Sequence, residues 1–289
     1  MQKIGGAFLL LLLCSLHGVD VAITIDDHPM ADTSFFGAYE RTERLLSACE
    51  NHNCKAAFFC VGEYCKKNQT SVDAVNRRGH FLANHSMTHP HVSTLSLSEF
   101  EEEVKGTQAL LEPHSQMRKY FRYPALDYGN QERLGGSREK GVAVLTLLKD
   151  LGYVDGYVSI NTYDWYLNTK LQEALRGKKR IDYTKLKNFY LSCMRQWCEH
   201  YIEFYENQLS ITPVQTLLLH ANDLNALYLD DILCMIRQLG WNIVSPEKAF
   251  QDTSWREKFI ADPTKLSIPP PFPSCQDIDR QLQELSIFG

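Results

Sequence analysis

The sequence predicts an α/β fold, a distorted (β/α) barrel of about seven strands. Short apolar or β-branched runs alternate with stretches of helical spacing along the 289 residues, which is typical of parallel βαβ units. The strand-like runs are too many for a small open sheet. Several of them end in a reactive side chain, and such residues gather at the carboxyl ends of barrel strands.

The predicted strands follow one another in a regular order. Residues 21–25 are apolar or β-branched throughout and predict a buried strand. Further strands are expected within residues 54–62, 71–85, 119–124, 142–161, 215–223 and 227–250. Helices are expected within residues 34–52, 71–85, 96–112, 142–161, 182–209 and 227–250. Ser98 and Glu101 have capping-box spacing at the start of one of these helices.

The helix over residues 182–209 belongs to a predicted insertion of about 168–210 in a domain of residues 19–255. Its apolar stripe is more typical of core packing than of a ligand shelf. The stripe consists of Leu186, Tyr190, Cys193, Trp197, Tyr201 and Phe204. From Asp262 the proline-rich sequence predicts no regular structure, so residues 256–289 are expected to form a tail packed on the domain.

The N-terminus has the features of an export signal. Lys3 precedes the apolar run "IGGAFLLLLLCSLHG", which is short for a membrane span but typical of a signal-peptide core. Residues 1–18 are therefore predicted to be a signal peptide, cleaved or kept as an anchor, and the chain to be periplasmic or secreted. The net charge of −5 argues against nucleic acid or anionic membranes as partners. No later stretch is long and apolar enough to span a membrane.

Cysteine usage agrees with export. Of nine cysteines, Cys14 lies in the predicted signal peptide, which leaves Cys49, Cys54, Cys60, Cys65, Cys193, Cys198, Cys234 and Cys275. An even number in an oxidising compartment favours disulfides, although the connectivity cannot be read from the sequence. A structural zinc site from the first four is the alternative, but C-x4-C-x5-C-x4-C lacks the close pairs of such sites.

Two aspartates and two histidines suggest a metal site. "VAITIDDHPM" (21–30) ends a predicted strand in adjacent carboxylates, and repulsion and desolvation make it costly to ionise both. "NHSMTH" places His85 and His89 four residues apart, so that both imidazoles can face one ion. Asp27 would complete a ligand set that leaves positions open for water, as in catalytic sites. The cation would keep Asp27 ionised and leave Asp26 free to act as a base.

In this order the motifs resemble those of the polysaccharide deacetylase family, the NodB-homology carbohydrate esterases. "TIDD" (24–27) is similar to the family's Thr-Phe-Asp-Asp motif, and "RGHFLANHSMTHPH" (78–91) to Gly-His-Glu-Ile-Gly-Asn-His-Thr-x-x-His-Pro. "FRYP" (121–124), "NTYDW" (161–165) and "LLLHAND" (217–223) resemble the Arg-x-Pro, Asp-x-x-Asp-Trp and Leu-x-His motifs. Several motifs in the correct order are more specific than any one alone.

Three positions depart from the family's pattern. His28 stands where a glycine usually follows the paired aspartates, and "RYPAL" lacks the glycine that ends the third motif. Asn161 stands where the fourth motif often begins with aspartate. These departures bear on the substrate more than on the metal or the acid–base pair.

The resemblance implies metal-assisted hydrolysis of an acetyl group on a sugar. It implies that Zn²⁺, or another divalent metal such as Co²⁺ or Ni²⁺, binds Asp27, His85 and His89 and polarises both water and the acetyl carbonyl. Asp26 would then be the general base, kept ionised by Arg122. The implied substrate is an N-acetylated, or O-acetylated, polysaccharide or oligosaccharide.

The remaining roles are implied in the same way. His220 would be the general acid, with Asp164 as its orienting partner. The backbone N–H of Ala125 would bind the oxyanion, and Trp165 would form a wall of the acetyl pocket.

Simpler interpretations exist for each of these residues. Asp164 alone reads as a strand-end cap, Arg122 as a solvated arginine, His220 as a core histidine and Trp165 as core. His28, His80 and His91 are taken as non-ligands, and Asp32, Asp127, Asp223 and Asp230 as ordinary loop or helix-start acids. Two other functions are compatible: a catalytically weak carbohydrate-binding protein on the same fold, or an amidohydrolase of a small non-sugar amide. The oligomeric state is not readable from the sequence.

Overall fold

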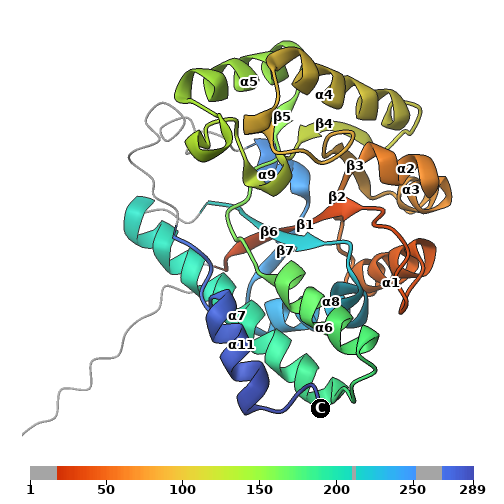
Figure 1. Cartoon of the computed structure of the whole chain (residues 1–289), viewed down its shortest axis with the longest axis vertical. Helices are drawn as coiled ribbons and strands as arrows, with labels where there is room; N and C mark the ends of the chain where they lie inside the picture. The colour runs from red at the N-terminus through yellow and green to blue at the C-terminus, as the bar shows by residue number, and fades with distance from the viewer. Residues whose placement is uncertain (1–17, 210–212, 252–268) are drawn as a thin grey trace, which may run out of the picture.

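The structure, a computed structural model, describes residues 18–209, 213–251 and 269–289 (Figure 1). Residues 1–17 of the predicted signal peptide, residues 252–255 of the predicted domain and residues 256–268 of the predicted tail lie outside these ranges. Among the described residues, no helix has the length and apolar character that a membrane crossing requires.

Seven parallel strands form one sheet in the order β5-β4-β3-β2-β1-β6, with β7 also paired to β1. The strands are β1 (Asp20–His28), β2 (Ala57–Cys60), β3 (Phe81–Asn84), β4 (Met117–Phe121), β5 (Val154–Asp155), β6 (Gln215–His220) and β7 (Asn242–Val244). The all-parallel sheet confirms the predicted α/β barrel class. Strands β2 and β3 are buried along their whole length, which explains their unbroken apolar sequences.

The sheet curls toward closure through the segment that follows β5. Gly156 N–H donates to the carbonyl of Phe121 in β4. A few residues further, Ile160 pairs with Leu217 of β6, and Ser159 N–H donates to Thr216 Oγ1 at 2.9 Å. This segment therefore connects the two sides of the half-barrel and brings the carboxyl ends of β1, β4 and β6 around one opening.

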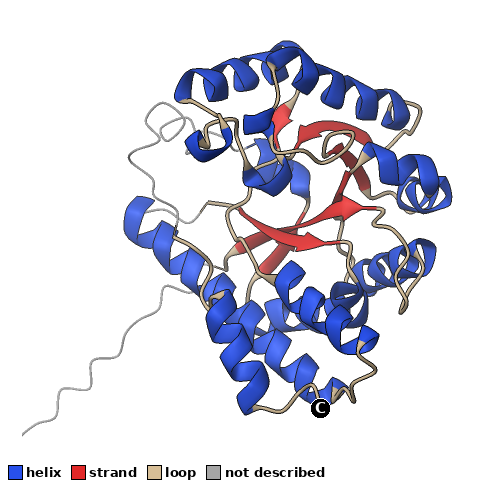
Figure 2. Ribbon diagram, viewed as in Figure 1, coloured by secondary structure: helices blue, strands red, loops and turns tan. Residues whose placement is uncertain are grey.

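Helices surround the sheet on its outside (Figure 2). They are α1 (Ala38–Asn51), α2 (Gly62–Lys67), α3 (Gln69–Arg77), α4 (Leu97–Leu111), α5 (Arg138–Asp150), α6 (Asp164–Arg176), α7 (Tyr183–Leu209), α8 (Asp223–Gln238), α9 (Pro246–Gln251) and α11 (Cys275–Glu284). Three short 3₁₀ turns, η1 (Val92–Thr94), η2 (Pro124–Leu126) and η3 (Glu132–Leu134), lie in the loops at the carboxyl end of the sheet.

The capping box of α4 lies two residues before the predicted position. The capping box consists of Ser96 and Glu99, not of Ser98 and Glu101. Ser96 is still extended, with φ −70° and ψ 165°, and its side chain accepts from the Glu99 N–H. Because a cap must precede the first helical residue, Leu97, the later serine already lies inside the helix.

The aromatic stripe of α7 packs in the core, as predicted. All of its members are fully buried except Phe204, which is partly buried. The C-terminal segment docks against it: Trp197 Nε1 donates to the carbonyl of Pro273 at 3.1 Å, and the Tyr201 hydroxyl to that of Pro269 at 2.9 Å. Helix α11, which the sequence analysis did not predict, buries Ile278 and Leu282 in the same core.

The expected disulfides are not found, because all eight described cysteines are free thiols. Six of them are buried and pack as small apolar side chains. Burial raises the pKa of Cys193 and of Cys198 to about 12, which keeps both thiols protonated. No cysteine joins a metal-ligand cluster within the described ranges, so the alternative of a structural zinc site is not supported.

Replacing Trp197 by alanine tests the docking of α7. Trp197 is fully buried, so Trp197→Ala is expected to lower the free energy of unfolding by about 3–5 kcal/mol. Trp165, which is 46% exposed, is the matched control, and Trp165→Ala should change that free energy by no more than about 0.5 kcal/mol. Urea denaturation of the two variants measures both values, and equal losses would contradict this packing.

Candidate active site

Asp26, on β1, is a buried carboxylate held by a buried arginine. The residue is 3% exposed, and Arg122 Nη1 lies 2.9 Å from one carboxylate oxygen and 3.2 Å from the other. Arg122 follows β4, and its other donors bind Thr24 Oγ1 and the carbonyls of Gly156 and Tyr157. The guanidinium is thereby fixed from three sides, and the carboxylate with it.

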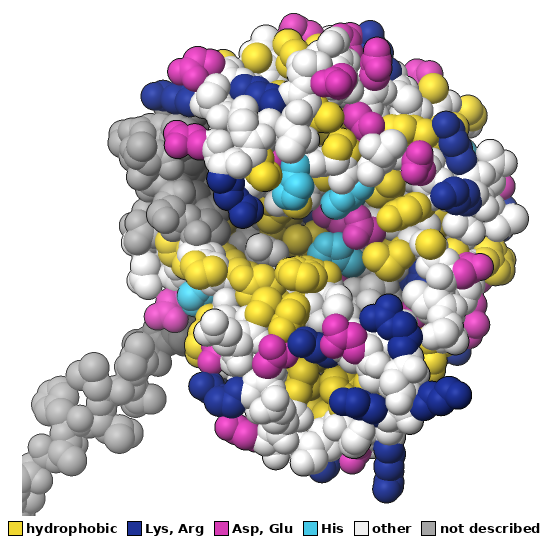
Figure 3. Space-filling model, viewed as in Figure 1, with side chains coloured by type: hydrophobic (Ala, Val, Ile, Leu, Met, Phe, Trp, Pro, Cys, Tyr) yellow, Lys and Arg dark blue, Asp and Glu magenta, His cyan; other side chains and the backbone are white. Residues whose placement is uncertain are grey.

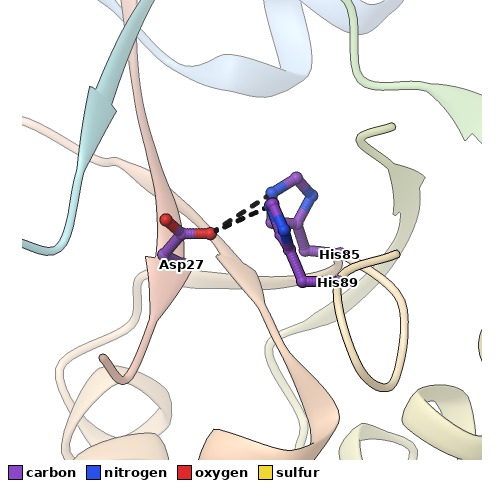
Figure 4. Close-up of side chains that lie close together, drawn as sticks. All are labelled: Asp27, His85 and His89. Atoms are coloured by element: carbon purple, nitrogen blue, oxygen red, sulfur yellow. Dashed lines mark ion pairs between the residues drawn. The ribbon is translucent and has the colours of Figure 1, made fainter. Parts of the chain in front are cut away.

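Asp27, His85 and His89 converge on one point (Figure 4). Asp27 Oδ1 lies 3.6 Å from His85 Nε2 and 3.3 Å from His89 Nε2. Asp27 has φ 61° and His89 has φ 59°, left-handed backbone conformations that turn both side chains out of the regular strand and loop directions. All three ligand atoms lie within 4.8 Å of one another.

The arrangement of His85 fits a metal ligand. Its Nδ1 lies 2.8 Å from the backbone carbonyl of Arg122, so this nitrogen carries the proton and Nε2 keeps a lone pair facing Asp27. Burial and the nearby His89 lower the pKa of His85 well below its usual 6.5, so the ring is neutral, as a ligand must be. Two imidazoles and a carboxylate are a donor set suited to Zn²⁺ and similar divalent ions.

The loop that carries the two histidines is anchored by its own hydrogen bonds. Glu103 of α4 accepts the N–H groups of Met87 and Thr88 at 2.8 and 2.7 Å, and the Thr88 hydroxyl at 2.8 Å. Ser86 Oγ accepts the N–H of His89 at 3.1 Å. These bonds hold His89 beside His85 before any ion binds.

His220 and Asp164 form the second half of the site. His220 ends β6, directly beside Asp26 in the strand register, and its Nδ1 lies 2.7 Å from Asp164 Oδ1. Asp164 is the first residue of α6 and is fully buried. It also accepts the backbone N–H of His220 at 2.9 Å. The pair therefore holds the imidazole with Nδ1 inward and Nε2 free to act.

Burial and charge set the protonation of these groups. Burial raises the pKa of Asp26 to about 6, although Arg122 and His220 lower it. Burial by itself would lower the pKa of His220, but Asp164 outweighs it and raises the pKa to about 10. Burial would likewise raise the pKa of Asp164, yet the charge and hydrogen bonds of His220 bring it below its usual value. At neutral pH the site therefore offers an ionised carboxylate and a protonated imidazole side by side.

Ala125 and Trp165 lie on the surface. Ala125 follows Pro124 in η2 with φ 52°, and it is exposed. Trp165 is 46% exposed and packs edge-on against Tyr163 and Tyr166, so it is not a core residue. Figure 3 shows histidine and acidic side chains near the centre of one face of the molecule, with hydrophobic side chains beside them.

Two acids that the sequence analysis took as ordinary are fully buried and structural. Asp223 pairs with Arg41 at 2.7 Å and also accepts the Thr33 hydroxyl at 2.6 Å. Asp127 accepts the hydroxyl and the N–H of Ser93 at 2.6 and 2.8 Å. The sequence carries no signal for them, because their partners are 34 to 190 residues away along the chain.

Among the histidines taken as non-ligands, His28 is fully buried against Phe58 and His80 Nδ1 accepts the N–H of Ala56. His91 lies 3.5 Å from Asp127, outside the cluster of Asp27, His85 and His89. Asn222, to which the sequence analysis gave no role, and Asn225, which lies outside every quoted motif, both donate to Asp164.

Comparison with known proteins identifies relatives of this chain. The sequence model described as "Polysaccharide deacetylase" matches residues 16–144. A peptidoglycan-N-acetylglucosamine deacetylase of Bacillus cereus is 32% identical over 92 residues, covering 32% of this chain and 30% of the relative. A chitooligosaccharide deacetylase of Rhizobium leguminosarum bv. trifolii is 31% identical over 88 residues, covering 30% and 37%. The chain spans about a third of the length of the first curated relatives it matches.

Solved structures share the fold at lower identity. A family 4 carbohydrate esterase from Streptomyces lividans in complex with acetate has a TM-score of 0.54 at 19% identity, covering 81% of this chain and 96% of that chain. A CE4 family pseudoenzyme from Bacillus anthracis has the same TM-score and identity, covering 81% and 66%.

The curled parallel sheet, with its reactive groups at the carboxyl ends of the strands, defines an α/β protein of the NodB-homology fold. The match to the polysaccharide deacetylase model within residues 16–144 confirms the resemblance seen in the sequence. The matched region contains Asp26, Asp27, His85, His89 and Arg122, whereas Asp164 and His220 lie beyond it.

Metal binding is testable with neighbouring histidines. His89→Ala removes a proposed ligand, so the dissociation constant for Zn²⁺ should rise by at least about 100-fold, the upper range seen for loss of an outer-shell partner. His91→Ala, two residues further along, changes a histidine outside the cluster and should leave the constant within about twofold of the original. Calorimetric titration of the metal-free variants with Zn²⁺ measures both constants. Equal Zn²⁺ affinities of His89→Ala and His91→Ala would show that His89 is not a ligand.

Proposed function

We propose that the protein is a metal-dependent hydrolase that removes acetyl groups from N-acetylated, or O-acetylated, sugars of a polysaccharide or oligosaccharide. One arrangement carries this proposal. Asp26, which is bound by Arg122, lies opposite the protonated His220 on the adjacent strand. Both lie beside the cluster of Asp27, His85 and His89. Base, acid and ion-binding groups are then within one small volume. The curated relatives, named as deacetylases of peptidoglycan and chitooligosaccharides, support the choice of substrate class.

Asp27, His85 and His89 would hold the ion, proposed to be Zn²⁺ or a similar divalent metal, and the ion would supply Lewis-acid polarisation of water and of the acetyl carbonyl. Asp26 would take the proton of the attacking water, with Arg122 keeping the carboxylate ionised and aimed. The N–H of Ala125 would stabilise the developing oxyanion.

His220 would donate its Nε2 proton to the leaving nitrogen, because an amine leaves poorly unless it is protonated. Asp164 would keep the imidazole charged and oriented through this step. Trp165, which is 46% exposed, would form a wall for the acetyl group or the sugar ring. The apolar N-terminal run further suggests that the enzyme acts on glycans outside the cytoplasm.

A catalytically weak carbohydrate-binding protein remains the second candidate, since one structural neighbour is described as a pseudoenzyme of the same CE4 family. The presence of Asp26, Arg122, Asp164 and His220 in bonded pairs favours catalysis over binding alone. Acetate release from chitooligosaccharides, peptidoglycan, acetylated xylan and small non-sugar amides, with added Zn²⁺, decides among the candidates. Acetate release from non-sugar amides alone would establish the third candidate function, an amidohydrolase of a small non-sugar amide.

Asp26→Asn separates the base from the metal ligands. The amide cannot accept the proton of water, so turnover is expected to fall by at least about 100-fold. Bound Zn²⁺, measured by elemental analysis, should stay at the wild-type ratio because Asp27, His85 and His89 are unchanged. A variant that loses the metal would instead make Asp26 a ligand and leave Asp27 as the base.

The alkaline limb of the rate profile tests the acid. His220 acts only when protonated, so activity should fall as pH rises through its pKa of about 10. Asp164→Asn removes the carboxylate that raises this pKa, and the limb should move to lower pH. The control Asp230→Asn, at an exposed carboxylate that contacts His52, should leave the limb in place. An unshifted limb in Asp164→Asn would remove His220 from the acid role.

A further inference from the structure

A chain of buried hydrogen bonds leads from α7 to His220. The Tyr190 hydroxyl of α7 donates to Asn225 Oδ1 at 2.5 Å. Asn225 Nδ2 then donates to Asp164 Oδ2 at 2.6 Å and to the backbone carbonyl of His220 at 2.8 Å. Asp164 in turn contacts His220 Nδ1 at 2.7 Å. Tyr190, Asn225 and Asp164 are all fully buried.

The two ends of the Asn225 amide have different partners. Its N–H groups face two oxygens, the Asp164 carboxylate and the His220 carbonyl, while its own oxygen faces the Tyr190 hydroxyl. A flipped amide would place its oxygen against the carboxylate, which is repulsive. Without the Tyr190 hydroxyl, the buried amide oxygen of Asn225 would lose its donor. Tyr190 therefore determines the orientation in which Asn225 can donate to Asp164.

We propose that Tyr190 and Asn225 are positioning residues, through which the long helix α7 holds Asp164 and hence the acid His220 in place. The proposal rests on the function proposed above for His220. The matched region of the family ends at residue 144, so α7 and α8 supply this support from outside it. The aromatic stripe of α7, which packs in the core, thus also reaches the site through the hydroxyl of Tyr190.

Two tyrosines of the same helix allow a matched test. Tyr201, like Tyr190, is a buried residue of α7, but its hydroxyl donates to the carbonyl of Pro269 instead. In the full-length chain, Tyr190→Phe is expected to lower kcat for acetate release about tenfold and to change KM by less than about twofold. Tyr201→Phe should leave both constants unchanged. Equal effects of the two substitutions would reduce Tyr190 to a packing residue and overturn the proposal.

A double-mutant cycle tests whether Tyr190 acts through Asn225. Asn225→Ala removes the amide, so Tyr190→Phe should cost about tenfold in kcat in the wild-type background and almost nothing in the Asn225→Ala background. Additive losses would show that Tyr190 does not act through Asn225. Urea denaturation of each variant separates loss of fold from loss of positioning.

A readout without turnover separates this inference from the proposed function. The proton between His220 Nδ1 and Asp164 gives a proton NMR signal, assigned by its absence in His220→Ala. Tyr190→Phe should shift this signal, and Tyr201→Phe should not. If the wild type releases no acetate while Tyr190→Phe still shifts the signal, the positioning stands and the deacetylase proposal fails. An unmoved signal in Tyr190→Phe overturns the positioning, whatever the wild type hydrolyses.

Discussion

Arg122 is 1% exposed, so no solvent satisfies its charge and each of its N–H groups must find a partner inside the barrel. The guanidinium binds Asp26 and Thr24 of β1 and two carbonyls of the segment after β5. The backbone of Arg122 binds the end of β3: its carbonyl accepts the hydrogen bond from His85 Nδ1, and its N–H donates to the carbonyl of Asn84. The proposed base and one proposed metal ligand are thus fixed by a single residue.

The half of the site that contains His220, the proposed acid, depends on a second buried charge. Asp164 starts α6 and receives donors from β6 and α8: the backbone N–H and the ring of His220, and the amides of Asn222 and Asn225. A buried carboxylate is stable only when such donors replace water. The two halves meet because β1 and β6 are hydrogen-bonded neighbours with Asp26 opposite His220. Strand pairing therefore sets the spacing between the proposed base and acid.

The buried charges of Arg122 and Asp164 control the protonation of the two buried groups beside them, Asp26 and His220. An aspartate in a low-dielectric environment binds protons more readily, and the raised pKa of Asp26 reflects that cost. The ion pair with Arg122 limits the rise and keeps Asp26 ionised at neutral pH. The imidazole of His220 experiences the opposite balance, because the carboxylate of Asp164 favours its charged form more than burial disfavours it. Neighbouring groups of one site are thereby held in different protonation states.

The sequence was informative wherever the signal was local or periodic. Parallel strands, helices and the core stripe of α7 follow from apolar spacing, and the aspartate–histidine cluster follows from motifs at strand ends. The cap of α4 was misplaced because two serines, Ser96 and Ser98, offered similar spacing and only the backbone of Ser96 decided between them. The free cysteines were misjudged because an even count does not report whether thiols are bonded. The thiol of Cys49 contacts that of Cys54, and that of Cys60 contacts that of Cys65, yet all four are free.

The sequence by itself determined the fold class, the resemblance to polysaccharide deacetylases and the chemical types present at the carboxyl ends of the strands. Only the tertiary structure decided which of these groups touch, since Asp26 and Arg122 are 96 residues apart and Asp164 and His220 are 56 apart. It also decided the supporting residues, Asn225 and Tyr190, which carry no motif. The physical reason is that hydrogen bonds act over about 3 Å in space, whereas spacing along a chain reports only the neighbours within one helix or strand.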